Sequence, residues 1–172
     1  MQSRMHRHAV RGAVAALLSA AMIAATAFTL PARAHHSFAP YNMEVVKVFT
    51  GVVTRVNPDA NHLQIFFAVM NDERKNVLRD PANKPILWAV EMTGSAQSAQ
   101  EGVSVNTFPA GTIFSVGLHP LRSGGPAGAR VAGTPLFKCP DKKPPAPGKH
   151  CDSVEGSTLI GKGSLPAPKE AS

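Results

Sequence analysis

Apolar and polar residues alternate along three segments in the first half of the chain, and we expect each segment to form a β-strand. The first covers residues 46–56, where β-branched residues hold every even position. Alternation returns over residues 63–69 and 86–92, after a turn-forming Asn-Pro-Asp-Ala-Asn run and a polar loop. A period of two is typical of strands that bury one face. Gly51 predicts a bend or bulge in the first strand. The alternating apolar residues of the other two strands are Leu63, Ile65, Phe67, Val69, Ile86, Trp88, Val90 and Met92.

A short helix and two further strands are expected after the third strand. Residues 93–102 tolerate a helix of about two turns, with Ser95 as its N-cap and Gly102 as its C-terminal stop. Residues 112–118 and 129–138 are the expected fourth and fifth strands. Three strands, a helix and two strands is the element order of the OB-fold. The sequence therefore predicts an all-β fold with one short helix, a small OB-like five-stranded β-barrel, with a β-sandwich as the alternative.

The first 34 residues have the layout of a secretory signal. Three arginines form a basic start without acids, an uncharged Ala- and Leu-rich stretch follows, and Ala32-Arg33-Ala34 has small residues at both recognition positions of a signal peptidase. We expect cleavage between Ala34 and His35, a periplasmic or secreted mature protein, and no membrane span after cleavage. An uncleaved anchor is the alternative, because the apolar stretch is long enough to cross a bilayer.

Removing this signal changes the charge and leaves material for one small domain. The chain has 18 basic and 11 acidic residues, but four arginines fall within the first 34 positions. The mature chain then carries 14 basic and 11 acidic side chains, and a net charge of +3 gives no reason to expect nucleic-acid binding. We divide it into an N-terminal segment (35–43), a β-barrel domain (44–138) and a C-terminal part (139–172). The Pro- and Gly-rich composition of the C-terminal part predicts a loop and a tail without a core.

The two cysteines, Cys139 and Cys151, flank a proline-rich run at the start of the C-terminal part. In an exported protein, an isolated pair at short spacing predicts a disulfide. Closing a loop of this size contributes about 3 kcal/mol in the chain-entropy treatment. The alternative is a metal site made of both thiolates and His150, which an oxidising compartment disfavours.

Several short motifs, taken in order, resemble those of a family of small exported bacterial proteins, domain-of-unknown-function family 6152. The resemblance covers residues 34–131, and it implies export and a small β domain but no activity. The proline-rich C-terminal part departs from the family pattern. The motifs are Ala34-His35-His36-Ser37-Phe38-Ala39, Gly51-Val52-Val53 leading to Asn57-Pro58, a histidine before the second strand, Trp88-Ala89-Val90-Glu91, and Gly117-Leu118-His119-Pro120-Leu121-Arg122-Ser123-Gly124.

Cleavage before His35 would create a metal chelate at the mature N-terminus. His35 would offer its α-amine and Nδ1 to one metal, and His36 adds a second imidazole. The α-amine has an ordinary pKa of about 7.7–8.0, so a metal displaces its proton near neutral pH. Nitrogen donors of this kind favour Cu(II). The arrangement resembles the histidine brace of copper proteins, which takes a further ligand from the folded body. His119 and His62 are the expected sources, and His150, in the proline-rich loop, is the least suited.

Two other functions stay open at this point. One is an OB-type module that binds a saccharide, peptide or protein partner, with the histidines incidental to it. The other is an oxidative copper enzyme that uses the same brace. The chain has no catalytic motif, and we therefore do not expect an enzyme. Trp88 occupies an alternating strand position, which favours a core role over ligand stacking. Because the histidines at the predicted mature N-terminus are the most specific chemical feature, an exported copper-binding module is the first expectation.

Overall fold

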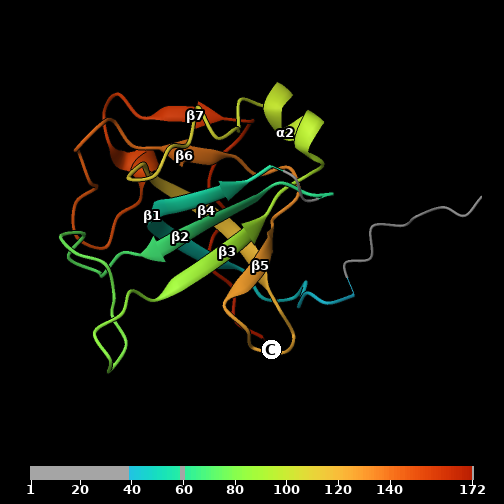
Figure 1. The fold of residues 1–172 in the computed structure, drawn as a ribbon, viewed down its shortest axis with the longest axis horizontal. Coiled ribbons are helices and arrows are strands. Elements are labelled where there is room, and N and C mark those ends of the chain that lie inside the picture. The colour runs from blue at the N-terminus through green and yellow to red at the C-terminus, as the bar shows by residue number, and fades with distance from the viewer. Residues whose placement is uncertain (1–38, 59–60, 172) are drawn as a thin grey trace, which may run out of the picture. The chain divides into compact units, whose positions relative to one another are not determined.

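Five strands close into a barrel in the computed structural model, which describes residues 39–58 and 61–171 (Figure 1). The elements are β1 (Lys47–Asn57), β2 (Gln64–Val69), β3 (Leu87–Glu91), α2 (Ser95–Gln100), β4 (Ile113–Pro120), β5 (Ala127–Arg130), β6 (Leu136–Lys138), the 3₁₀ turn η1 (Cys151–Ser153) and β7 (Thr158–Ile160). The barrel strands follow the order β1-β2-β3-β5-β4, and a β1–β4 ladder closes the ring. Only the β3–β5 pair within this ring is parallel. This arrangement confirms the predicted OB-like barrel over the sandwich.

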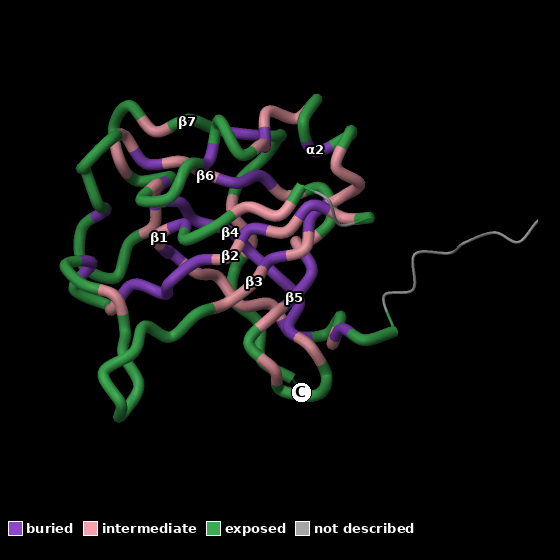
Figure 2. The backbone as a smooth tube through the Cα atoms, viewed as in Figure 1, coloured by how far each residue is buried: buried purple, intermediate pink, exposed green. Residues whose placement is uncertain are grey.

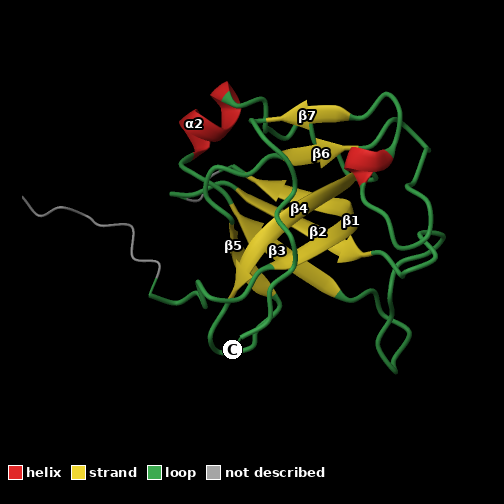
Figure 3. Ribbon diagram, turned by 180° about the vertical axis from the view of Figure 1, so that it is seen from behind, coloured by secondary structure: helices red, strands yellow, loops and turns green. Residues whose placement is uncertain are grey.

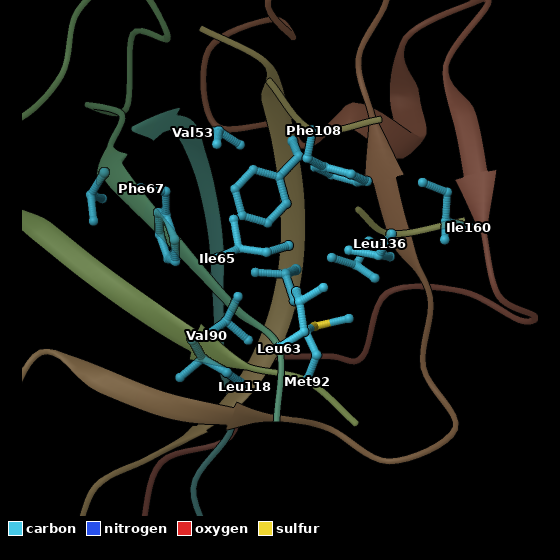
Figure 4. Close-up of a cluster of buried hydrophobic side chains, with 14 residues drawn as sticks. Val53, Leu63, Ile65, Phe67, Val90, Met92, Phe108, Leu118, Leu136 and Ile160 are labelled. Atoms are coloured by element: carbon cyan, nitrogen blue, oxygen red, sulfur yellow. The ribbon is translucent and has the colours of Figure 1, made fainter. Parts of the chain in front are cut away.

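The hydrophobic core fills the barrel with the alternating residues of β2 and β3 and with side chains from β4, β6 and β7 (Figure 4). Phe67 and Phe108 both pack edge-on against Phe114, with ring centroids 5.3 and 5.8 Å apart. Burial of each such ring contributes about 1.5–3 kcal/mol. Figure 2 shows buried stretches along the barrel strands and exposed connections around them. The core residues are Val53, Leu63, Ile65, Phe67, Val69, Val90, Met92, Val103, Phe108, Phe114, Val116, Leu118, Leu136 and Ile160.

β1 faces the core with its odd positions and turns most of its β-branched face outward. Val53 is fully buried, and Phe49 packs against the core. A Cβ atom on Gly51 would lie 2.4 Å from Cδ2 of Phe67, so the phenylalanine ring fills the space that a side chain would need. The bulge predicted at Gly51 lies further along, because the β1–β2 register shifts just after Val53. This shift changes the alternation, and Val56 beyond it also packs against the core.

α2 lies between β3 and β4, as predicted, and is six residues long. Gly94 holds the N-cap position expected for Ser95, and the Ser95 hydroxyl donates a 2.5 Å hydrogen bond to the carbonyl of Pro58. Gly102 follows the helix with φ of +89°, a conformation that favours glycine, which confirms the predicted stop. Within the described ranges, no helix is both long enough and apolar enough to cross a bilayer.

The single fifth strand predicted over residues 129–138 is wrong, because this segment contributes to two strands. β5 ends at Arg130 and β6 begins at Leu136, with a turn in which Gly133 has φ of +74°. Pro135 adds a residue without a backbone N–H just before β6. The break allows different pairings, since β5 lies between β3 and β4 whereas β6 extends the sheet from the other part of β4.

The C-terminal part folds against the barrel, although its composition predicted a loop and a tail without a core. Cys139 and Cys151 are buried, and β7 pairs with β6 and places Ile160 in the core. These few apolar residues are dispersed among prolines and glycines, so no periodic pattern marks them. Because Ile160 belongs to the core, the apolar core extends beyond the predicted barrel domain to residue 160.

The last residues, 161–171, cross the outer side of the barrel and are called the C-terminal strap below (Figure 3). Val46 and Lys169 exchange two backbone hydrogen bonds, of 2.8 and 2.9 Å. Gly117 of β4 makes room for the Pro166 ring, because a Cβ atom there would lie 2.2 Å from Cγ of the proline. The strap thus covers part of the face that β1 and β4 turn away from the core.

Candidate functional site

Residues 39–46, which include the described part of the predicted N-terminal segment, run alongside the end of β4. Two backbone hydrogen bonds of 2.8 Å join residues 40–42 to residues 120–122, around an antiparallel bridge between Tyr41 and Leu121. These bonds use backbone groups, so the apolar pattern contained no signal for them. From residue 40 onward, the chain that follows the predicted mature N-terminus is fixed to the barrel.

His119, one of the predicted metal ligands, lies near the end of β4 with a fixed imidazole. Its Nδ1 donates a 2.8 Å hydrogen bond to the carbonyl oxygen of Val45, two residues before β1, and His119 is 8% exposed. Because a carbonyl oxygen only accepts, Nδ1 carries the proton and the lone pair of the neutral ring lies on Nε2. Metal-binding histidines commonly have this arrangement, with one ring nitrogen held by a carbonyl or carboxylate.

Glu91, the last residue of β3, connects His62 to the N-terminal segment. Its Oε1 lies 2.5 Å from Nδ1 of His62, and its Oε2 accepts a 2.9 Å hydrogen bond from the hydroxyl of Tyr41. The side chains of His62 and Glu91 are 24% and 27% exposed. Burial, followed by the hydrogen bond and the charge of Glu91, raises the pKa of Tyr41 to about 12. The carboxylate therefore orients one imidazole and holds a protonated phenol.

The strand register places Glu91 and His119 in one row across the outer side of the sheet. Both residues are paired with Ala129 of β5, Glu91 from one side and His119 from the other. Neighbouring strands lie about 4.8 Å apart, so the two Cα atoms are separated by about 10 Å. Residues paired in this way point to the same face of the sheet. We call Tyr41, His62, Glu91 and His119 the histidine face.

The histidine face does not hold a metal by itself. Within residues 39–58 and 61–171, no three His, Cys, Asp or Glu side chains are grouped closely enough to bind one. The first two predicted ligands, His35 and His36, lie outside the described residues, and so do Ala34 and the predicted signal segment. The histidine face offers two oriented imidazoles, one of which is held by a carboxylate. A metal site there would need further donors.

Most of the chain, including the five barrel strands, matches a known family model. The match, to a family of unknown function (DUF6152), covers residues 22–130. This chain belongs to the DUF6152 family. The match confirms the resemblance drawn from the short motifs. Neither a curated protein nor a solved structure matches the chain.

The DUF6152 match includes the five barrel strands and all four residues of the histidine face, and it ends before β6. Tyr41 and Glu91 are the members of this face that sequence reasoning missed. Glu91 belonged to a recognised motif but had no assigned role, because its partner Tyr41 lies 50 positions away in the chain. One sequence signal could have identified Glu91: it is a carboxylate near the end of a predicted strand, and His62 lies just before the predicted strand that precedes it in the chain.

Beyond the DUF6152 match, the predicted disulfide between Cys139 and Cys151 is confirmed. Both sulfurs are oxidised, so the alternative metal site of two thiolates and His150 is wrong. His150 instead has its Nδ1 2.8 Å from Oγ1 of Thr50. The disulfide indicates an oxidising environment, in keeping with export.

Proposed function

We propose that this DUF6152 member is an exported Cu(II)-binding module whose site combines the mature N-terminal His35 and His36 with His119 of the barrel. The observation that carries the proposal is the fixed ring of His119, whose Nδ1 donates to the Val45 carbonyl and whose lone pair is on Nε2. In the part of the chain that the structure describes, no hydrogen bond to that Nε2 is present. His62, held by Glu91, is the other imidazole of the histidine face.

The pairing of the N-terminal segment with β4 supports this assignment. Tyr41 is bridged to Leu121, two positions beyond His119 in the chain. His36 precedes Tyr41 by five positions, and five extended residues span at most about 17 Å. The barrel histidines are therefore within the covalent reach of the predicted N-terminus, and the chain needs no long flexible linker.

The donor set agrees with Cu(II) more than with other divalent ions. An α-amine and up to three imidazoles are borderline nitrogen donors, and Cu(II) stands highest among first-row ions for such sites. The histidine face suits this role because its rings are already oriented, by a backbone carbonyl at His119 and a carboxylate at His62. Cleavage of the signal in the periplasm or during secretion would create the amine.

Calorimetric titration of Cu(II) into the mature chain, which begins at His35, tests this function. We expect a sub-micromolar dissociation constant that weakens at least tenfold when one alanine is added before His35, because the extension removes the amine from the chelate ring. His119→Ala should weaken binding by about ten- to a hundredfold, as loss of a ligand or its support does at other metal sites. His62→Ala is the matched control and should have the smaller effect.

Three results would overturn the proposal. Equal affinity with and without the added alanine would show that the N-terminal amine does not bind the metal. Unchanged affinity in His119→Ala would show that His119 is not a ligand. A larger loss of copper affinity in His62→Ala than in His119→Ala would show that His62, and not His119, is the barrel ligand. Copper-dependent turnover of oxygen with a reductant, faster than that of free copper, would be needed to call the protein an enzyme.

An OB-type module for a peptide or protein partner is the second candidate function. The observation in its favour is a group of exposed aliphatic side chains on and before β3, where Leu78, Ile86 and Leu87 are 41%, 36% and 46% exposed. Exposed apolar groups near one another commonly mark interaction sites. Absence of copper binding by the mature chain would favour this function. Unchanged copper affinity in a variant with Leu78, Ile86 and Leu87 all replaced by serine would show that the two surfaces are independent.

A further inference from the structure

A chain of hydrogen bonds joins the disulfide loop, residues 139–151, to the outer side of β1 and β4. The backbone N–H of Cys151 donates to Oγ of Ser115 at 2.9 Å. Ser115 Oγ lies 2.8 Å from Oγ1 of Thr50, which lies 2.8 Å from Nδ1 of His150. Ser115 is fully buried and Thr50 is 1% exposed. Each bond in this chain therefore replaces one that water would otherwise make.

The direction of every proton in this chain follows if His150 is neutral and carries its proton on Nε2. Thr50 then donates to the lone pair on Nδ1, Ser115 donates to Thr50, and Cys151 N–H donates to Ser115. All three buried groups have a partner for each proton. The neutral histidine, as the final acceptor, is what makes this arrangement complete.

Protonation of His150 reverses the chain and leaves one proton without an acceptor. A charged imidazole must donate from Nδ1, so Thr50 accepts from it and donates to Ser115. Ser115 then accepts from both Thr50 and Cys151, and its own hydroxyl proton has no further acceptor among its hydrogen bonds. Leaving a buried donor unsatisfied is more costly than losing an exposed hydrogen bond. The docked loop therefore disfavours the charged ring.

The charges around His150 act on the same equilibrium. Arg74, from the connection between β2 and β3, is 7% exposed and donates through Nε to the carbonyl of Lys149 at 2.9 Å. Burial, followed by the positive charge of Arg74, lowers the pKa of His150 from its ordinary value of 6.5, and Asp152 opposes this in part. β1 and β4 contribute only the hydroxyls of Thr50 and Ser115 to this network.

We propose that the disulfide loop is an acid-sensitive clasp, docked on β1 and β4 by neutral His150 and released when this histidine is protonated. The disulfide keeps the released loop closed, so the change is local and reversible. Because the folded-state pKa of His150 is lowered, the docking free energy is complete above pH 6.5. It declines as the pH falls below 6.5, and it is lost as the pH passes through the folded-state pKa.

Hydrogen exchange measured by mass spectrometry on the full chain, with its disulfide intact, tests the clasp. After correction for the intrinsic exchange rate, we expect amides of residues 145–154 to exchange up to about tenfold faster at pH 5.5 than at pH 7.5. Peptides from β2 are the internal reference and should keep their protection, because the core does not depend on the clasp. Equal protection of residues 145–154 at the two pH values overturns the proposal, and so does an equal loss in β2.

Two substitutions at one position make the test specific to His150. His150→Asn places an amide oxygen near the position of Nδ1, where it accepts from Thr50 but does not titrate. We expect this variant to hold the loop at both pH values. His150→Ala removes the acceptor, and the loop should exchange quickly at both. Acid release in His150→Asn equal to that of the wild type would assign the effect to another group and overturn the proposal.

Discussion

Glu91 and Tyr41 give the histidine face its order, although neither is a metal ligand in the proposal. The Glu91 carboxylate uses one oxygen for Nδ1 of His62 and the other for the hydroxyl of Tyr41. A carboxylate with two donors is held in one orientation, and it fixes which nitrogen of the imidazole carries the proton. At the scale of single residues, the N-terminal segment and the turn before β2 are therefore tied to the same side chain.

The first prediction concerns the ionisation of Tyr41, which is the only tyrosine in the chain. Its absorbance near 295 nm should titrate with a midpoint of about 12 in the folded protein and near 10 in denaturant. Because the folded-state pKa is the higher one, the protonated phenol stabilises the fold up to pH 10, and this contribution is lost between pH 10 and 12. Glu91→Gln should move the folded midpoint back toward 10. A midpoint of 10 in the folded wild type would contradict the hydrogen bond to Glu91.

At the scale of elements, alternation predicted the strands well where one face is buried and the other is not. β2 and β3 have the predicted core faces, because Leu63, Ile65, Phe67 and Val90 lie toward the barrel interior. The core face of β1 was not evident, because β-branched residues line the opposite side of the strand, where Thr50 is buried by the C-terminal part. Propensity alone does not decide the buried face when both faces are covered.

The second prediction concerns the close packing of β1 against β2. Gly51→Ala places a methyl group within 2.4 Å of the Phe67 ring and 2.9 Å of the Ala68 carbonyl oxygen. We expect it to lower the free energy of unfolding by about 1–3 kcal/mol, as overpacking does elsewhere. Urea denaturation followed by Trp fluorescence measures this change. Gly125→Ala is the control, because its Cβ would meet only side-chain ends, those of Leu121 at 3.3 Å and Ser123 at 3.7 Å. Equal stability of both variants would argue against the packing described.

At the scale of the whole domain, residues 139–171 support the barrel that precedes them. The disulfide, β7 and the C-terminal strap all contact β4, β6 or the start of β1. A compositional reading could not predict this, because proline and glycine indicate turns but do not say what the turns pack against. The partners of the candidate site were hidden for a related reason. β-Bridges pair residues 41 and 121, and residues 46 and 169, which lie far apart in the chain.

The third prediction follows from this support. A chain that ends at Lys138 loses the disulfide, β7 and the C-terminal strap, and it exposes Thr50, Ser115 and the outer side of β4. The disulfide alone contributes about 3 kcal/mol, so the melting temperature should fall by about 10 °C or more. Circular dichroism of the two chains measures the difference. Removal of residues 170–172 is the control and should change the melting temperature little. An unchanged melting temperature in the chain that ends at Lys138 would show that residues 139–171 do not stabilise the barrel.

The reciprocal hydrogen bonds between Val46 and Lys169 bring the last residues of the domain beside the segment that leads into β1. A Gly-Ser linker could join the C-terminal strap to the segment ahead of β1, and new ends could be opened in the exposed turn over residues 80–85. Such a circular permutant would keep every strand pair but would have no free amine ahead of residue 39. The same adjacency makes the domain suitable for insertion into a surface loop of another protein, because entry and exit of the chain are neighbours.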